Sequence, residues 1–259
     1  MKIAISGKGG VGKTTLSALL VGTWALKGRC VIALDADPDA NLASALGVAA
    51  SEEVQPLSEM GDLIAERTGA KGNYGGYFKL NPKVDDIPEA YAKHIGTIRL
   101  LTLGGIARGG GGCICPASAL VRALMTHVVL GRDDVVVMDM EAGIEHLGRA
   151  TAQGTDALIV VVDGSPWSVR TALRVKALAG DIGMTRVQAV LNRVTDATDI
   201  ARIERDLDGV PLIGHVPYDM DLAAGALRKG PDGQPQATEA LTRHAPAVEA
   251  IVAALDAPR

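Results

Sequence analysis

Glycine, lysine and threonine recur in a fixed order near the N-terminus, in the segment Gly-Lys-Gly-Gly-Val-Gly-Lys-Thr-Thr that begins at Gly7. The spacing fits the phosphate-loop pattern, in which four residues separate two glycines and a Lys-Thr pair follows the second. Glycines let backbone N–H groups turn toward phosphate oxygens. A glycine-rich turn without a ligand would not need lysine and threonine in register. The segment therefore predicts a magnesium–nucleotide site.

Each position of this loop has an expected task. Lys13 should reach the β- and γ-phosphates, and the Thr14 hydroxyl should ligate Mg²⁺. A helical pattern follows the loop, so a helix N-terminus should add partial positive charge at the phosphates. The residues expected to contact the nucleotide are Gly9, Gly10, Val11, Gly12, Lys13, Thr14 and Thr15.

Carboxylates end two later apolar runs. Asp35 and Asp37 come after one run, and Asp139 comes directly after another. Carboxylates at the C-terminal ends of parallel strands face the ligand crevice, so these three should lie beside Mg²⁺ and the γ-phosphate. Asp139 should hold the ion, as in a Walker B strand. Asp39 is expected to cap the turn that follows it, a role that Asp37 could also take.

Two cysteines one residue apart, Cys113 and Cys115, could bind a soft metal ion. A helix is expected to begin at Pro116, and thiols at a helix N-terminus ionise readily. Thiolates suit Zn²⁺, Ni²⁺ or an iron–sulfur cluster, yet a closed site needs four ligands and one chain offers two. A symmetric dimer would supply four. The alternatives are a redox-sensitive pair and two small buried hydrophobes, although the glycines just before Cys113 argue against burial.

Strand and helix patterns that alternate along the chain must position these side chains. Apolar runs without strict alternation predict strands covered on both faces, and helices between them predict a mostly parallel sheet. We therefore expect an α/β fold, with one P-loop domain over residues 1–259. The predicted strands are Ile3–Ser6, Cys30–Leu34, Ile98–Leu103, Val135–Met138, Leu158–Val162, Val187–Leu191 and Leu212–Val216. Helical patterns are expected between these strands, for example at Thr14–Lys27, Ala117–Leu130, Trp167–Ala179 and Ala237–Leu255.

Two stretches lack this alternation. Residues 51–96 contain several prolines and glycines, and we expect a short helix near Leu57–Arg67 followed by a loop. Residues 225–236 are expected to form a surface loop. The first of these stretches is a candidate docking region for a partner protein.

Net charge and the length of the apolar runs indicate which classes of partner to expect. The 259 residues carry a net charge of −4, without a basic stripe or an apolar run long enough for a membrane span. Neither nucleic acid nor a membrane is therefore an expected partner. The N-terminus runs directly into the first strand, and three cysteines do not suggest a disulfide framework. A cytoplasmic location is expected.

The segment KGGVGKTT resembles the deviant Walker A loop of the SIMIBI class of ATPases, which includes MinD, ParA and the nitrogenase iron protein. The resemblance implies that Lys8 crosses a dimer interface to the other subunit's nucleotide, and that Asp37 orients the attacking water. With Lys13, these are the expected catalytic residues. The chain has no guanine-specific NKxD motif, so ATP is favoured. The resemblance also implies an adenine side formed by Asn192, Arg193, Pro217, Tyr218 and Asp219.

Three further features resemble the CooC family, ATPases that assist nickel insertion into carbon monoxide dehydrogenase, with close relatives that serve acetyl-CoA synthase. They are the Cys-x-Cys pair, the segment from Asp139 to Arg149 and the segment from Leu80 to Pro88. The resemblance implies an ATPase that forms a homodimer and holds Ni²⁺ between copies of Cys113 and Cys115, or Zn²⁺ in its place. Its expected client is one of these two apo-enzymes.

Two other functions stay open. A ParA- or MinD-like positioning ATPase shares the phosphate loop, but the tail at 241–259 has few lysines and few large apolar residues for a membrane helix. An iron–sulfur electron carrier of the nitrogenase type needs a second cysteine shortly after Asp139, and the stretch to Arg149 has none. The nickel function is therefore the preferred hypothesis.

Overall fold

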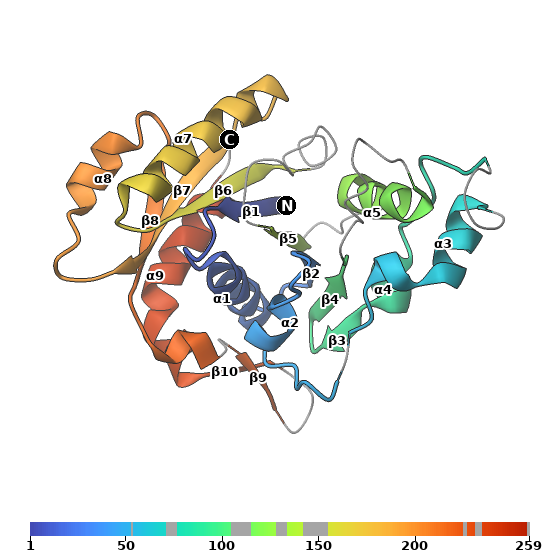
Figure 1. The fold of residues 1–259 in the computed structure, drawn as a ribbon. Coiled ribbons are helices and arrows are strands. Elements are labelled where there is room, and N and C mark those ends of the chain that lie inside the picture. The colour runs from blue at the N-terminus through green and yellow to red at the C-terminus, as the bar shows by residue number, and fades with distance from the viewer. Residues whose placement is uncertain are drawn as a thin grey trace.

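A sheet of eight strands runs through the middle of the protein, with helices on both of its faces (Figure 1). The computed structural model describes residues 1–52, 54–70, 77–104, 115–127, 134–141, 155–224, 227–230 and 235–257. The expected α/β fold with a mostly parallel sheet is confirmed. The strands are β1 (Lys2–Gly7), β2 (Val31–Ala36), β3 (Lys93–Ile95), β4 (Ile98–Thr102), β5 (Val135–Met140), β6 (Ala157–Val162), β7 (Val187–Val194) and β8 (Leu212–Pro217).

The order of the strands brings distant parts of the chain together. It is β3-β4-β2-β5-β1-β6-β7-β8, and every neighbouring pair is parallel except β3 and β4. β1 lies between β5 and β6, so the loop after it opens near the middle of the sheet's C-terminal edge. β2 and β5 are neighbours, and their register places Asp35 opposite Asp139.

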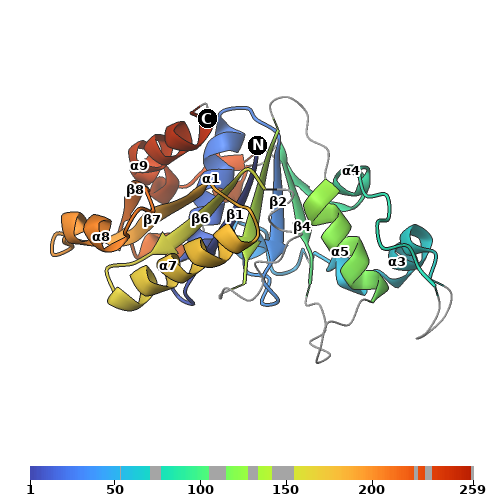
Figure 2. The same ribbon diagram turned by 90° about the horizontal axis from the view of Figure 1, so that it is seen from above.

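Helices form a layer on each side of the sheet (Figure 2). Their bounds are α1 (Lys13–Leu26), α2 (Leu42–Ala45), α3 (Gly61–Thr68), α4 (Ile87–Tyr91), α5 (Pro116–His127), α7 (Pro166–Asp181), α8 (Ile200–Asp206) and α9 (Glu239–Asp256), with 3-10 turns η1 (Leu57–Glu59) and η2 (Asp221–Ala224). α1, α2 and α9 contribute to the core on one face, and α3, α4, α5, α7 and α8 contribute to the core on the other. Among the described residues, no helix combines the length and the apolar character needed to cross a bilayer.

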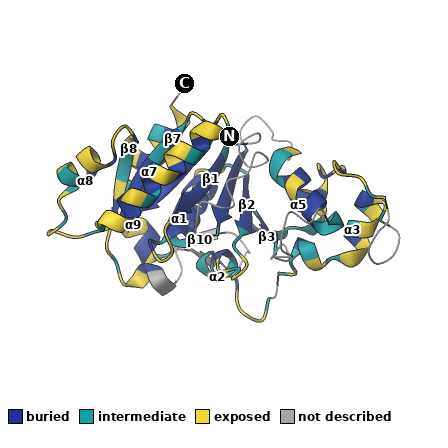
Figure 3. Ribbon diagram, turned by 45° about the horizontal axis from the view of Figure 1, so that its top comes forward, coloured by how far each residue is buried: buried dark blue, intermediate teal, exposed yellow. Residues whose placement is uncertain are grey.

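The strands are buried on both sides because their side chains alternate between these two cores. Ile3 and Ile5 of β1 pack with α1 and α9, whereas Ala4 between them packs on the opposite face. Every residue of β5 and β6 is buried, and the central strands are mostly dark blue in Figure 3. Valine and isoleucine suit such pleated surfaces. The polar exceptions lie at strand ends, where the candidate site is.

Residues 51–96 have more regular structure than expected. The predicted helix near Leu57–Arg67 is wrong as a single element, because Met60 has a non-helical backbone (φ −80°, ψ 75°) and separates η1 from α3. The predicted loop also contains α4 and the short strand β3. That strand pairs antiparallel with β4 and forms one edge of the sheet.

Two further elements differ from the sequence prediction. Within the predicted loop 225–236, β9 (Leu227–Lys229) pairs antiparallel with β10 (Pro235–Ala237). No bounds were predicted for the helix α8, which lies between two predicted strands where a helical pattern was expected. Its N-cap residue is Asp199, whose side chain accepts the N–H of Arg202 (2.9 Å). An aspartate at that position is a normal helix-start signal, so α8 was within reach of sequence reasoning.

Candidate nucleotide and metal site

The phosphate loop lies where β1 ends and α1 begins. Gly12 is the N-cap residue of α1, has a left-handed backbone (φ 92°, ψ 36°) and provides no side-chain cap. The first N–H groups of a helix have no acceptor inside it, so those of α1 are left for a ligand. Together with the positive end of the helix dipole they favour an anion, as expected for phosphate.

Asn192 packs against this loop from β7. Its Nδ2 donates a buried hydrogen bond to the carbonyl oxygen of Val11 (2.8 Å). A Cβ atom on Gly12 would collide with the same Nδ2, so only glycine permits this approach. Gly7 is similarly constrained, because a Cβ there would lie 2.6 Å from the carbonyl oxygen of Val161 on β6. Contacts with β6 and β7 therefore determine the shape of the loop.

The two lysines of the loop differ in exposure. Lys13 is only 7% exposed at the start of α1, where the half-buried Thr14 and Thr15 follow it. Lys8 and the two glycines after it are exposed. Lys13 is thus placed to serve the chain's own nucleotide, whereas Lys8 is open to a second molecule.

Asp139 ends its run of apolar strand residues with 1% of its surface exposed. The hydroxyl of Ser17 on α1 donates to Oδ1 (3.0 Å), whereas Oδ2 is buried and has no hydrogen-bond partner in the described part of the chain. Burial raises the pKa of this carboxyl to about 6, although the hydroxyls of Thr14 and Ser17 and the charge of Lys13 act in the opposite direction. A buried oxygen without a donor is costly, so Oδ2 is suited to a cation.

Asp35 is fully buried beside Asp139. Its Oδ2 accepts the N–H of Leu42 (2.9 Å), and its Oδ1 accepts the N–H of Asp37 (3.2 Å). Burial raises the pKa of Asp35 to about 7, and the charge of Asp139 adds to the rise while the two backbone hydrogen bonds oppose it. The main effect of the side chain is to hold the loop 36–41 against the strand end. Asp37 is carried by that loop.

The prediction that Asp39 caps the following turn is wrong. α2 begins at Leu42, and its N-cap residue Asn41 makes no side-chain cap. Asp39 is exposed, and its N–H donates to Oδ1 of Asp37 (3.0 Å). The capping oxygen comes instead from Asp35, which lies seven residues before Leu42 and was outside the local pattern.

These groups fit the chemistry of a magnesium site. Mg²⁺ takes oxygen ligands, commonly one or two carboxylates together with phosphates and water. Oδ2 of Asp139 lacks a donor, the Thr14 hydroxyl lies beside that carboxylate, and the charge of Asp37 is close enough to raise its pKa. The residues that would hold Mg²⁺ are Thr14, Asp37 and Asp139, directly or through water.

Two strand ends carry the other residues expected at the adenine side. Arg193 is exposed near the end of β7, with a left-handed backbone (φ 60°). Pro217 ends β8, and Tyr218 after it is 56% exposed. The N–H of Tyr218 donates to the carbonyl oxygen of Val194 (2.8 Å), which joins the two strand ends.

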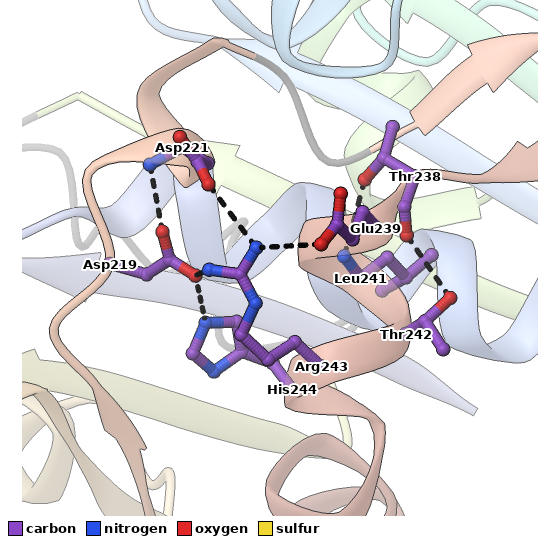
Figure 4. A network of polar contacts seen from close by, with 8 residues as sticks. All are labelled: Asp219, Asp221, Thr238, Glu239, Leu241, Thr242, Arg243 and His244. Atoms are coloured by element: carbon purple, nitrogen blue, oxygen red, sulfur yellow. Dashed lines mark hydrogen bonds and ion pairs between the residues drawn. The ribbon is translucent and has the colours of Figure 1, made fainter.

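Asp219 faces the C-terminal helix α9 (Figure 4). Its Oδ2 accepts hydrogen bonds from Nε2 of His244 (2.9 Å) and from the guanidinium of Arg243 (2.6 Å), and its Oδ1 accepts the N–H of Asp221 (2.8 Å). These contacts lower the pKa of Asp219, with the His244 hydrogen bond as the largest cause. Both carboxylate oxygens are thus bonded to protein atoms, so the predicted contact with a nucleotide would have to share them.

Cys115 lies directly before α5. Its Sγ accepts the N–H of Ser118 (3.4 Å) and lies 3.1 Å from the Ser118 hydroxyl, while its carbonyl oxygen accepts the N–H of Ala119 (3.0 Å). Burial alone would raise the pKa of this thiol, but these and other hydrogen bonds lower it overall. The thiolate, the form that binds metals, therefore forms more readily here than at an ordinary cysteine. Cys113 lies outside the described residues, and within them no group of three His, Cys, Asp or Glu side chains could hold a metal.

Known proteins resemble this chain in sequence and in fold. Residues 2–231 match the family model of the CobQ/CobB/MinD/ParA nucleotide binding domain. Carbon monoxide dehydrogenase accessory protein CooC of Rhodospirillum rubrum is 43% identical over 226 residues, which cover 86% of each chain. The chain belongs to the CooC family. Another relative, an uncharacterized ATP-binding protein of Methanocaldococcus jannaschii, is 47% identical over 225 residues, which cover 86% of this chain and 87% of that protein.

Solved structures place the CooC family within the MinD/ParA fold. A chain of the MinC:MinD cell division protein complex of Aquifex aeolicus superposes with a TM-score of 0.67 at 22% identity, covering 100% of this chain and 98% of that chain. A ParA family ATPase from Chlorobium tepidum gives a TM-score of 0.66 at 20% identity, covering 97% and 96% of the two chains. At such low identity the similarity concerns the fold.

Sequence reasoning missed one supporting side chain of this site, Ser17, and one supporting contact of the predicted residue Asn192. Ser17 lies four residues after Lys13, hence on the same side of α1, and this spacing could have pointed to its contact with Asp139. The hydrogen bond from Asn192 to Val11 joins positions 181 residues apart, and no local signal could have revealed it.

Proposed function

We propose that this CooC-family protein is an ATP-hydrolysing metallochaperone that delivers Ni²⁺ to carbon monoxide dehydrogenase. The observation that carries this proposal is the 43% identity, over 86% of both chains, to a carbon monoxide dehydrogenase accessory protein. The client is expected to dock on residues 51–96, where Tyr77 and Leu80 are large side chains exposed at the surface.

The proposed ATP site uses the phosphate loop as a preformed anion site. The uncapped N-terminus of α1 and the buried Lys13 would hold the phosphates, and Asp37 on the loop after β2 would orient the attacking water. When bound, Mg²⁺ would neutralise charge on the β- and γ-phosphates. Asp139 and Thr14 are the side chains that would keep it in place.

Nickel is the cargo in this proposal. One chain contributes Cys113 and Cys115, and a second copy would complete four sulfur ligands on a two-fold axis. The hydrogen bonds from Ser118 favour the thiolate at Cys115. Lys8, exposed at the loop, would reach the nucleotide of the second copy and so link ATP binding to closure of the metal site.

A chain of contacts supports coupling between the two sites. The carboxylate of Asp35 holds the loop that carries Asp37, and the carbonyl oxygen of Asp35 accepts the N–H of Leu103 (2.8 Å). Leu103 follows β4 and begins the connection toward Cys113 and Cys115. Movement of the Asp37 loop on hydrolysis would therefore be transmitted to the segment that carries the thiolates, which would loosen the site for nickel transfer.

The test is nickel stoichiometry together with oligomer mass. We expect purified protein to bind one Ni²⁺ per dimer, and light scattering to show a dimer with Ni²⁺ and with ATP. The double variant Cys113→Ser plus Cys115→Ser should lose tight nickel binding in equilibrium dialysis, because hydroxyls are poor ligands for this ion.

Cys30→Ser is the matched control, since Cys30 lies directly before β2 and far from the proposed ligands in the sequence. Removal of its thiol should leave nickel binding unchanged. ATP binding by the double variant shows that it is folded. If that variant still bound one nickel per dimer as tightly as the parent protein, the nickel assignment would be wrong.

A further inference from the structure

A pocket of about 340 Å³ lies between the phosphate loop and α7. It is lined by Lys8 from the loop and by Trp167, Arg170, Thr171 and Arg174 from the helix. The volume is at the lower end for small-molecule pockets. The nucleotide and nickel functions leave the four helix residues without a role.

The spacing of these residues along α7 places them on one face of the helix. Positions 167, 170, 171 and 174 follow the i, i+3, i+4, i+7 spacing of a single helix face. The opposite face, with Val169, Ala172 and Val175, is buried against the sheet, so the orientation of α7 is fixed. Trp167 remains 63% exposed in its first turn.

The charges in the pocket are unbalanced. In the part of the chain that the structure describes, no carboxylate lies within 4.0 Å of the cationic groups of Lys8, Arg170 or Arg174, whereas Arg202 on α8 and Arg243 on α9 are paired with acids. Three cations that gather without counter-charges on a chain of net charge −4 indicate a site for an external anion.

Asp163 at the end of β6 is the acid to consider as an internal partner. Its Oδ1 accepts the N–H (3.0 Å) and the hydroxyl (2.6 Å) of Ser165, which itself caps α7. Burial alone would raise its pKa, but hydrogen bonds from Ser165 and Ser168 and the charge of Lys8 lower it overall. The carboxylate of Asp163 is thus hydrogen-bonded to the first residues of α7, and its interaction with Lys8 is electrostatic, without a direct contact.

We propose that this pocket binds an acidic segment of a partner protein, one that carries carboxylates next to an apolar side chain. Arginine guanidinium groups match carboxylates in geometry, and an exposed tryptophan offers a flat apolar surface beside them. Tryptophan and arginine are also the residue types that most often dominate binding energy in protein interfaces. Four of the five lining residues follow one face of α7, so the pocket suits a segment lying along that helix.

The proposal goes beyond the nucleotide and nickel function and does not depend on it. Lys8 belongs to both the pocket and the phosphate loop, and it is the residue proposed above to reach the nucleotide of a second copy, so a bound segment and a second copy would compete for Lys8. The assay below uses neither nucleotide nor nickel, so its failure would leave the metallochaperone proposal untouched, and the reverse also holds.

The test is peptide binding by fluorescence anisotropy. The probe is a fluorescein-labelled peptide of alternating glutamate and leucine, compared with a peptide of equal length in which glutamine replaces glutamate. We expect the glutamate peptide to bind at least about tenfold tighter than the glutamine peptide, because only carboxylates compensate the three cations. The variant Arg170→Ala plus Arg174→Ala should weaken glutamate-peptide binding by at least about tenfold.

The matched control is Lys27→Ala plus Arg205→Ala, which removes two exposed positive charges elsewhere and should change the affinity less than about twofold in salt of about 0.15 M. Equal binding of the two peptides, or equal weakening by the two double variants, would overturn the proposal. So would tighter, Arg170- and Arg174-dependent binding of a single-stranded oligonucleotide or of anionic phospholipid vesicles. A dimer that forms without peptide and is lost with Arg170→Ala plus Arg174→Ala would assign the face to a second copy instead.

Intrinsic fluorescence gives an independent readout at the pocket. The chain has two tryptophans, and Trp24 is fully buried, so an aqueous quencher reports on Trp167. Iodide should quench Trp167 more strongly than caesium, because the cations attract the anion, and the glutamate peptide should protect it. Quenching that the peptide leaves unchanged would show that the peptide does not cover this pocket.

Discussion

Gly12 shows how one residue can determine the shape of the phosphate loop. Its left-handed backbone begins α1, and its missing side chain leaves space for the amide of Asn192. Gly10 in the same loop also has a left-handed backbone (φ 83°), but no atom lies within 4 Å of the place a Cβ would take. A side chain at Gly10 would therefore meet backbone strain alone, whereas a side chain at Gly12 would meet backbone strain and a steric clash.

We predict that Gly12→Ala destabilises the protein more than Gly10→Ala. Both variants place an L-residue in the left-handed region, at a cost of about 1–2 kcal/mol. Only Gly12→Ala must also displace Asn192 and break its hydrogen bond to Val11, for roughly 1 kcal/mol more. Urea unfolding measures both. Equal losses would mean that the amide moves away at no cost.

Single residues also mark the limit of what the sequence could predict. The phosphate loop was predictable because its residues are contiguous and each type has a fixed task. The cap at Asp39 was wrong because Asp35 reaches Leu42 from the strand before it. Cys113 lies outside the described residues, so the paired thiolates stay a prediction.

At the scale of elements, α9 is joined to the segment after β8 by a buried hydrogen bond between Asp219 and His244 (2.9 Å). The side chains of Asp219 and His244 are 6% and 4% exposed, whereas Arg243, which also binds Asp219, is 46% exposed. Arg243 pairs with the exposed Asp221 as well (3.2 Å). The network joins α9 to the segment after β8. The buried contact between Asp219 and His244 should contribute more to stability than the solvent-exposed contacts of Arg243.

We predict that Asp219→Ala lowers the thermal midpoint by several degrees, and that Asp221→Ala changes it much less. Both variants remove a carboxylate from Arg243, but only the first leaves a buried histidine without its partner. Thermal denaturation followed by circular dichroism at neutral pH is the measurement. The low pKa of Asp219 means that its contribution is present above its ordinary pKa and is lost at more acidic pH. Similar losses for both variants would contradict the assigned role of burial.

Elements with strong periodicity were predicted well, and short ones were not. The helices α1, α7 and α9 lie within about two residues of their expected bounds, because long apolar faces must meet the sheet. The break at Met60, the edge strand β3 and the β9–β10 pair were missed, since three- or four-residue elements are stabilised by their neighbours rather than by a pattern of their own.

At the scale of the whole molecule, two buried carboxylates lie on neighbouring central strands of a largely apolar sheet. Asp35 and Asp139 are paired in register on β2 and β5, and both have raised pKa values, about 7 and about 6. In the pH range between about 4 and about 7, the folded state therefore binds more protons than the unfolded state. The free energy of unfolding falls as the pH rises through this window, and the stabilising effect is complete only below it.

We predict that Asp35→Asn makes stability less dependent on pH. Between about pH 5 and pH 7, wild type should lose on the order of 2 kcal/mol more than the variant, because one pKa unit corresponds to about 1.4 kcal/mol. Urea unfolding of nucleotide-free protein at both pH values gives the comparison. Asp196→Asn, at an exposed position, should behave as wild type does. A variant with the wild-type slope would show that Asp35 is already ionised at acidic pH.

The position of β1 between β5 and β6 has a consequence during translation. The ribosome releases β1 first, yet neither neighbour is available until Val135 and then Ala157 have left the exit tunnel. For more than half of its synthesis, the nascent polypeptide therefore carries its N-terminal strand without either flanking strand. The earliest residues made are among the last to take their final shape, and a polypeptide released early by the ribosome would contain the complete glycine-rich motif without the strands that support it.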